Sequence, residues 1–173
     1  MTPGSTWPCM HTMPLSRKAT AEAYHRHLAC HRAADWSGMA DLFAPDATYH
    51  DPFFGLAEGQ EAIRAFLVRS MTGLDDWTFP IEWTAIDEGR VVYRWRNTLP
   101  VRRRDGRPFD FPGISSLAYD DTGLVTQQTD LYDRAQCLQV LAEAKLPGVE
   151  RALDSAKWLS SPFVAMAHRW AGR

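Results

Sequence analysis

The feature that most constrains the fold of this 173-residue chain is a change of hydrophobic period at Pro45. Before this proline, apolar residues recur at helical spacing: Trp36, Met39, Leu42 and Phe43. After it, Ala47, Tyr49 and Asp51 alternate with their neighbours at the period of two that is typical of a strand. A helix ending near Ala44 is therefore predicted to lead directly into a short strand with a carboxylate on the same face as a tyrosine.

Hydrophobic periodicity and turn signals also predict the other elements. Helices are expected over residues 16–33, 59–73 and 133–145, and strands over 48–52, 77–86, 90–99, 108–119 and 124–132. Ser16 caps the first helix in this interpretation, and one stripe of the 59–73 helix is expected to be buried: Ala62, Ile63, Phe66 and Leu67. Helices followed by strands with short turns predict an α+β domain, in which one curved antiparallel sheet wraps around the helices.

The predicted organisation is one domain with an extension at each end. Residues 1–15 read as a loosely packed tail, and residues 16–146 form the domain. Residues 147–173 are too apolar for a free tail, so we expect one or two extra helices there, packed over a pocket mouth or at a partner subunit. The start of the chain does not have the pattern of a signal peptide, and no apolar run is long enough to cross a membrane.

Charge and cysteine content exclude several function classes. The formal net charge is -2, which argues against nucleic acid or anionic lipid as a partner. The one dense basic run, residues 102–104, precedes Asp105 and Gly106, a turn signal, and is expected at a solvated hairpin tip. Three widely spaced cysteines without a CxxC arrangement predict reduced thiols and a cytoplasmic location.

The segment from residue 42 to 55 and the "G-EAI--F" pattern in residues 59–66 together resemble the SnoaL-like and ketosteroid isomerase superfamily, also called nuclear-transport-factor-two-like. In that superfamily a helix, "LFA-DA", a strand and "DP" follow one another as they do here, and the resemblance runs over residues 21–141. It implies a cone-shaped sheet, a pocket between sheet and helices, a homodimer through the convex face and no cofactor. The superfamily contains isomerases, dehydratases, cyclases, epoxide hydrolases and binding domains, so the fold leaves the reaction open.

The resemblance implies that Asp51, in the "DP" after the strand, is a general base. A carboxylate performs this role when it is incompletely solvated, and Phe53 and Phe54 provide apolar surroundings. The alternative interpretation is that Asp51 is a turn residue that ends the strand.

The superfamily's isomerases stabilise an oxyanion with a tyrosine and a protonated aspartate. Here the tyrosine position falls on His27, with Tyr24 one turn earlier, and the aspartate position falls on Ser115. Together with Tyr49, His27 and Ser115 are expected to orient the substrate or stabilise an oxyanion. A neutral serine is the weaker acid, which favours a related proton transfer over steroid isomerisation itself.

Limonene-type epoxide hydrolases offer a second comparison. Tyr49, Asp51 and Asp130 occupy places similar to those that hold the attacking water in these enzymes. However, Arg96 is followed by Thr98 where these enzymes have an Arg-x-Asp pair. Arg96 is instead expected either to orient an anionic group or to pair with Asp130 as a buried salt bridge, and the two residues are expected at the polar end of the pocket.

The sequence does not decide which face of the strand over residues 90–99 points inward. Tyr93 and Trp95 lie on one face, and Arg94 and Arg96 lie on the other. The substrate pocket is expected to include these side chains: Tyr24, Phe53, Phe54, Phe66, Trp95, Phe111 and Gln128. Aromatic walls with a few polar groups favour a ring-shaped or terpenoid ligand.

His27 and His31 have the i,i+4 spacing of metal ligands, but no HExxH or cysteine pair accompanies them, so no metal is expected. The resulting hypothesis is a cytoplasmic, cofactor-free isomerase, dehydratase or cyclase that binds a small apolar molecule, with Asp51 as general base. Two alternatives stay open: a non-catalytic ligand-binding or assembly domain of the same fold, and a limonene-type epoxide hydrolase.

Overall fold

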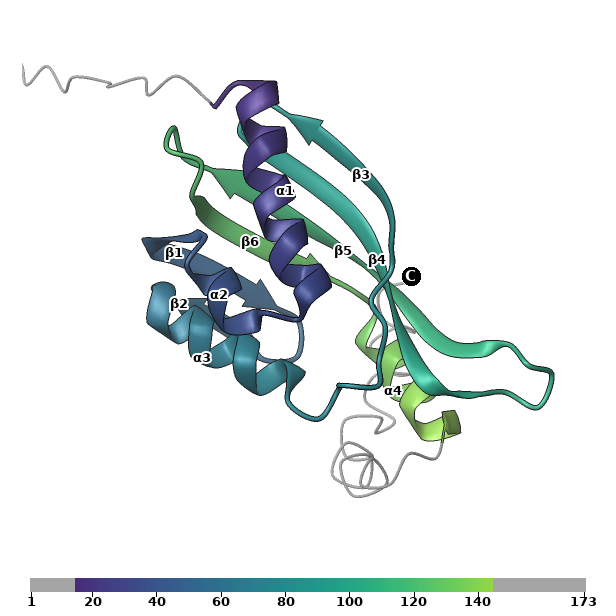
Figure 1. Ribbon diagram of the computed structural model, residues 1–173. Coiled ribbons are helices and arrows are strands. Elements are labelled where there is room, and N and C mark those ends of the chain that lie inside the picture. The colour runs from purple at the N-terminus through teal and green to yellow at the C-terminus, as the bar shows by residue number, and fades with distance from the viewer. Residues whose placement is uncertain (1–14, 145–173) are drawn as a thin grey trace, which may run out of the picture.

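The computed structural model describes residues 15–144, which form one curved, unclosed six-stranded sheet with helices against its concave face (Figure 1). The helices are α1 (Arg17–Ala33), α2 (Trp36–Ala40), α3 (Gln60–Met71) and α4 (Arg134–Ala144). The strands are β1 (Phe43–Asp51), β2 (Gly55–Glu58), β3 (Ile81–Asp87), β4 (Arg90–Arg102), β5 (Pro108–Tyr119) and β6 (Val125–Leu131). The predicted α+β class with a curved sheet is confirmed, while the expected tail and C-terminal helical extension lie outside the described residues.

The strand order is β2-β1-β6-β5-β4-β3. Every neighbouring pair is antiparallel except β1 and β6, which pair in parallel with a register shift between Phe43 and Thr48. Pro45 lies within this irregular stretch, where its missing N–H removes no regular ladder bond. The parallel pair brings the first and last strands together, so Tyr49 lies opposite Gln128.

Three local predictions need correction. The second helix ends at Ala40 rather than near Ala44, because residues 43 and 44 already belong to β1 and are buried there. Strand β2 was not expected, since it is a short and mostly exposed edge strand with no apolar alternation. In α3, Ala62 is exposed, and only Ile63, Phe66 and Leu67 of the predicted stripe are buried.

Helix α1 begins as the sequence predicts, with the Ser16 hydroxyl accepting the Ala19 backbone N–H at 3.3 Å. Its fully buried face holds these residues: Thr20, Ala23, Tyr24 and His27. Thr20 donates to the Ser16 carbonyl at 2.9 Å and accepts the backbone N–H of Gly89 at 2.9 Å. This hydroxyl therefore connects the start of α1 to the turn between β3 and β4.

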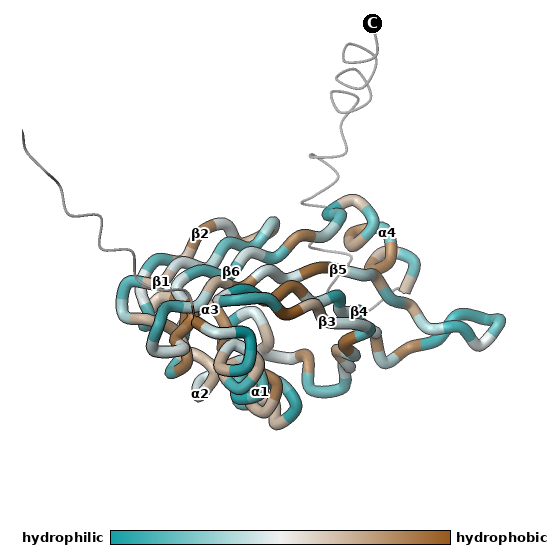
Figure 2. Tube along the Cα trace, turned by 90° about the horizontal axis from the view of Figure 1, so that it is seen from above, coloured by the Kyte–Doolittle hydropathy of each residue, from teal (hydrophilic) through white to brown (hydrophobic). Residues whose placement is uncertain are grey.

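Burial alternates over residues 90–96 of β4, which settles the parity that the sequence left open. Val91, Tyr93 and Trp95 are buried on the inner face, whereas Arg94 and Arg96 point to the outer face. Beyond the body of the domain β4 and β5 continue as a long hairpin, whose tip is hydrophilic (Figures 1 and 2). The arginine run lies at this tip, as predicted. None of the helices within residues 15–144 is long and apolar enough to span a membrane.

We predict that Thr20→Val lowers the free energy of unfolding by about 1–3 kcal/mol, because valine keeps the shape but leaves the buried Gly89 N–H without its acceptor. Urea unfolding followed by far-ultraviolet circular dichroism measures this. Thr48→Val is the matched control, since the Thr48 side chain makes no hydrogen bond within residues 15–144, and its effect should stay within about 0.5 kcal/mol. Equal effects of the two substitutions would contradict the assigned role of Thr20.

Candidate ligand-binding cavity

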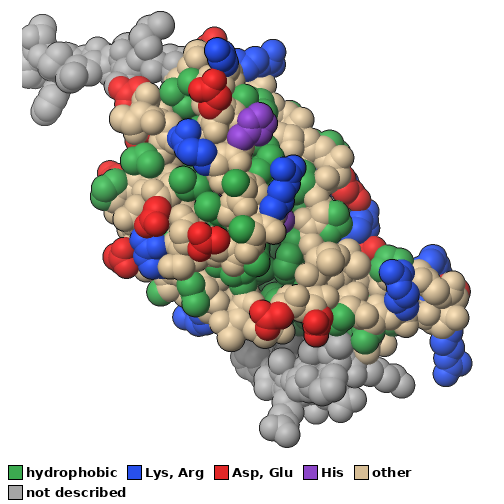
Figure 3. All heavy atoms as spheres, in the orientation of Figure 1, with side chains coloured by type: hydrophobic (Ala, Val, Ile, Leu, Met, Phe, Trp, Pro, Cys, Tyr) green, Lys and Arg blue, Asp and Glu red, His purple; other side chains and the backbone are tan. Residues whose placement is uncertain are grey.

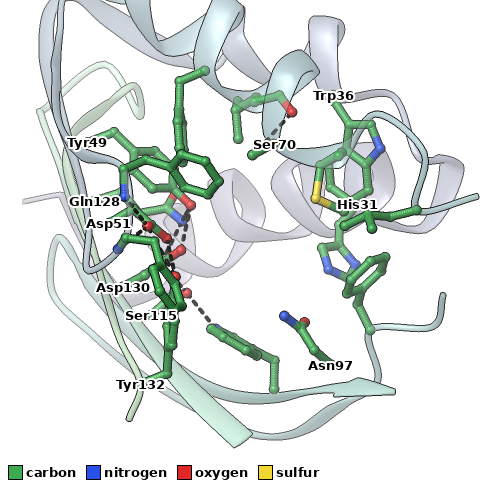
Figure 4. A pocket seen from close by; sticks show the side chains of 18 of the residues that line it. His31, Trp36, Tyr49, Asp51, Ser70, Asn97, Ser115, Gln128, Asp130 and Tyr132 are labelled. Carbon is green, nitrogen blue, oxygen red and sulfur yellow. Dashed lines mark hydrogen bonds between the residues drawn. The ribbon is translucent and has the colours of Figure 1, made fainter. Parts of the chain in front are cut away.

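A cavity of about 450 Å³ lies between the concave face of the sheet and the helices. Its walls come from all four helices, from the segment before β3 and from the inner faces of β1, β4, β5 and β6. Most of the lining is apolar, and hydrophobic side chains gather in a recess at the middle of one face of the molecule (Figure 3). The polar groups concentrate at one end, where Tyr49, Asp51, Ser115, Gln128 and Asp130 lie close together (Figure 4).

Asp130 is the centre of this polar end. Its Oδ2 accepts the Tyr49 hydroxyl at 2.7 Å, and its Oδ1 accepts the Ser115 hydroxyl at 2.6 Å and the Gln128 amide at 3.2 Å. All three donors are buried side chains, from β1, β5 and β6 respectively. A buried carboxylate is expensive unless it is hydrogen-bonded, and the residues around Asp130 meet that requirement.

The proton positions in this cluster follow from groups that can only donate. The Trp95 indole N–H donates to the Ser115 oxygen at 2.8 Å, so the hydroxyl proton of Ser115 is left for Asp130. In the same way the Gln128 amide donates to the Tyr49 oxygen at 2.9 Å, and the phenol proton of Tyr49 goes to Asp130. Tyr49, Ser115 and Gln128 therefore all donate to Asp130, and this arrangement fits an ionised carboxylate.

A glycine makes room for one of these donors. Gly113 lies opposite Trp95 in the β4–β5 ladder, and a Cβ added to it would come within 2.2 Å of the indole ring. Any larger residue would thus displace Trp95 and the indole N–H that orients Ser115. Gly113 is required at this position for space rather than for backbone conformation.

Burial and hydrogen bonding shift the pKa of Asp130 in opposite directions. Burial raises the pKa of Asp130, and the nearby Asp51 adds to this, while the Ser115, Tyr49 and Gln128 hydrogen bonds lower it. For Tyr49, burial and the adjacent Asp130 carboxylate raise the phenol pKa well above 10.0, so this group remains a neutral donor. The cluster therefore holds a desolvated carboxylate in place.

Asp51 both ends its strand and lines the cavity. Its Oδ1 accepts the backbone N–H groups of Phe53 at 2.7 Å and Phe54 at 2.9 Å, which is the turn geometry that the alternative interpretation predicts. The Tyr132 hydroxyl lies 3.1 Å from both carboxylate oxygens of Asp51 and is the partner of Oδ2. Oδ2 thus retains a lone pair for a further donor.

The opposite end of the cavity is aromatic. His31, Trp36 and Phe79 meet edge to face, with ring centroids 5.6 to 6.2 Å apart. His31 and Trp36 lie across the open space from the carboxylates (Figure 4). We call these three residues the aromatic trio. Burial lowers the pKa of His31, which favours its neutral form. This end offers flat apolar faces rather than charge.

His27 is a buried residue of the cavity wall. Its Nε2 lies 3.4 Å from the Tyr93 hydroxyl, and its Nδ1 has no hydrogen-bond partner within residues 15–144. Burial lowers the His27 pKa to about 3, with a smaller contribution from His31. The ring is therefore neutral at physiological pH.

Eleven of the thirteen predicted site residues line the cavity: Tyr49, Asp51, His27, Ser115, Asp130, Phe53, Phe54, Phe66, Trp95, Phe111 and Gln128. Arg96 and Tyr24 do not. The predicted pair of Arg96 with Asp130 is wrong, because Arg96 faces outward and binds Glu82 at 2.7 Å and Asp110 at 2.9 Å. Tyr24 turns toward β3 and bonds to Thr84 at 3.2 Å, behind Tyr93.

The list of predicted site residues omitted several cavity residues. Tyr132 was recognisable, since it shares one strand face with Gln128 and Asp130, but the pattern alone did not indicate its contact with Asp51. The omitted Trp77 and Phe79 lie in the irregular segment before β3, where no periodicity indicates which side chains turn inward.

No group of three or more His, Cys, Asp or Glu side chains within residues 15–144 has the geometry of a metal site. Cys137 lines the cavity, but burial raises the pKa of its thiol to about 12, which keeps it protonated and unreactive. The other polar groups of the described cavity wall include carboxylates, phenols, hydroxyls, imidazoles and amides.

A curved sheet with helices around a cavity that holds buried carboxylates defines an α+β domain. Residues 21–128 match the family described as the SnoaL-like domain, and the chain belongs to this family. Comparison with curated proteins finds no match.

Two solved structures share the fold. One is Bal32a from a soil-derived mobile gene cassette, 22% identical, with a TM-score of 0.55 over 68% of this chain and 92% of that one. The other is a putative SnoaL-like polyketide cyclase from Shewanella denitrificans, 21% identical, with a TM-score of 0.58 over 72% and 97% of the two chains. At these identities the likeness shows the fold alone.

We predict that the neutral, buried state of His27 makes the protein less stable in acid. The folded-state pKa of about 3 lies below the unfolded reference of 6.5, so the unfolded state takes up a proton first as the pH falls. The free energy of unfolding should lose about 1.4 kcal/mol per pH unit from this residue between pH 6 and pH 4.

Urea unfolding at several pH values measures this slope in wild type and in His27→Gln. The variant should lack this part of the slope whatever its absolute stability. His25→Gln, on the exposed face of the same helix, is the control and should keep the wild-type slope. Parallel curves for wild type and His27→Gln would contradict the assignment.

Proposed function

We propose that this protein binds a small, mainly apolar, ring-containing molecule in the cavity, with the polar group of that molecule at the Asp51 and Asp130 end. The observation that carries the proposal is a cavity with aromatic walls and one polar end, in which Asp130 is already held by three buried donors. Preformed cavities that are mostly apolar and have a few fixed polar groups are typical ligand sites.

The size and shape of the cavity support a ligand of one to three fused rings. About 450 Å³ is at the lower end of the usual range for small-molecule sites, roughly 300–1,000 Å³. The aromatic trio at one end and Trp95, Phe111 and Tyr132 near the other provide two sets of ring faces and edges. A planar or slightly puckered ring system would contact both.

A second candidate function is catalysis of proton transfer, as in an isomerase, dehydratase or cyclase, with Asp51 as the base. The observation that favours it is that Asp51 lines the cavity and that its Oδ2 has the Tyr132 hydroxyl as its one partner within residues 15–144. Asp130, whose two oxygens accept three donors, is better suited to fixing the site. The epoxide hydrolase alternative has no such support, because Arg96 lies on the outer face of the sheet.

For the binding function we predict that 2-tetralone, a two-ring ketone, binds the wild-type protein and that Trp36→Ala weakens this binding about tenfold. The substitution removes an aromatic wall of the cavity, and a tenfold loss corresponds to about 1.4 kcal/mol. Isothermal titration calorimetry measures the affinity. Trp83→Ala is the matched control, because Trp83 is exposed and does not line the cavity. Failure of the wild type to bind, or equal losses in both variants, would contradict the proposal.

For the catalytic function we predict that the wild type accelerates exchange of the C1 protons of 2-tetralone in D2O, followed by proton NMR. Asp51→Asn should reduce the rate by about 10² to 10⁴, since it removes the proton acceptor. Asp46→Asn, an exposed aspartate on the same strand, should exchange at the wild-type rate. Binding of 2-tetralone without any acceleration over buffer would reject catalysis by Asp51 and leave the binding function in place.

A further inference from the structure

The charged side chains among the described residues that line the cavity are all acidic. Asp51 and Asp130 both line it, and no lysine or arginine is among its described lining residues. His27 and His31 also line it, but burial lowers the pKa of both, so neither supplies a positive charge near neutral pH. A ligand therefore meets two carboxylates and no compensating cation, a setting that repels anions and attracts cations.

Gln128, which lines the cavity, also carries a buried acceptor without a donor. Gln128 Oε1 is buried and has no hydrogen-bond partner within residues 15–144. The orientation of this amide is determined by its neighbours, because Nε2 donates to Asp130 Oδ1 and to the Tyr49 oxygen. A flipped amide would place its oxygen against the carboxylate, which can only accept. Together with the partly satisfied Asp51 Oδ2, Gln128 Oε1 makes acceptors outnumber donors at this end of the cavity.

Aromatic side chains surround the same end. The Tyr132 ring centroid lies 5.8 Å from that of Trp95, 6.0 Å from Phe111 and 5.7 Å from Phe53. The negative faces of such rings attract a cation placed within about 6 Å of them. Carboxylates, an unpaired amide oxygen and ring faces all favour the same chemical group, a positively charged nitrogen that carries protons.

We infer that the ligand of this cavity is a protonated amine attached to an apolar ring system. Its ammonium group donates to Asp51 Oδ2, Asp130 and Gln128 Oε1, and its rings extend across the open space toward the aromatic trio (Figure 4). This inference rests on the proposed binding function and specifies the class of ligand.

A matched series of probes tests it: 2-naphthylmethylamine, 2-naphthalenemethanol and 2-naphthoate. They share one ring system and are cationic, neutral and anionic at neutral pH. Calorimetric titration of the full chain with each probe gives the three dissociation constants. We expect the amine to bind at least tenfold more tightly than the alcohol and the naphthoate to bind most weakly.

Substitutions test whether the preference for the amine arises in the cavity. Asp51→Asn should reduce the preference for the amine over the alcohol at least fivefold, and Asp130→Asn should do the same where it folds. Asp46→Asn, which removes an equal charge from an exposed position on β1, should keep the wild-type preference. A thermal melt of each variant shows whether it is folded.

The outcomes separate this inference from the function on which it rests. If the alcohol binds as tightly as the amine, the inferred ligand class is wrong while the binding function stands. If none of the probes binds and 2-tetralone does not bind either, the proposed function itself fails. An amine preference that Asp51→Asn leaves unchanged would also overturn the inference, because the cation would then bind elsewhere.

Discussion

The hydrogen bond between Tyr49 and Asp130 is the interaction on which the site depends. It joins side chains 81 residues apart across the parallel contact of β1 and β6, at a distance of 2.7 Å. A buried carboxylate at this position requires donors from several directions, and Ser115 and Gln128 supply them. Trp95 in turn orients Ser115, and Gly113 leaves space for Trp95. The buried carboxylate of Asp130 thus explains why residues on four strands are donors or make room for donors.

The charged side chains on the two faces of the sheet have different partners. On the outer face Arg94 and Arg96 share the carboxylate of Glu82, and Arg96 also binds Asp110, so positive and negative charges compensate each other. These pairs are partly exposed and contribute little to stability individually. On the inner face Asp51 and Asp130 have hydrogen-bond donors, but no lysine or arginine of residues 15–144 lines the cavity beside them. The alternation of β4 separates these two environments, because it directs every arginine of residues 90–96 away from the cavity.

Local patterns predicted most elements, whereas the relations between strands were harder to predict. Ser16 capping and the period-two runs of β4 to β6 identified their elements, since each depends on neighbours in sequence. The parallel pairing of β1 and β6 and the short edge strand β2 depend on long-range packing. The error at Arg96 has the same origin, because alternation shows that Trp95 and Arg96 face opposite ways but not which of them faces inward. Asp51 fitted two descriptions, and the structure shows that its turn contacts and its place in the cavity coexist.

The direction of the hydrogen bonds limits the chemistry that this site supports. Tyr49 and Ser115 were expected to orient the substrate or stabilise an oxyanion, yet both direct their single proton to Asp130. Turning either hydroxyl toward a ligand would remove a donor from a buried carboxylate, which costs more than an ordinary hydrogen bond provides. A ligand that brings an oxyanion therefore competes with Asp130 for the same protons. A ligand that brings protons instead satisfies acceptors that are already in place, so the existing network favours a donor in the cavity.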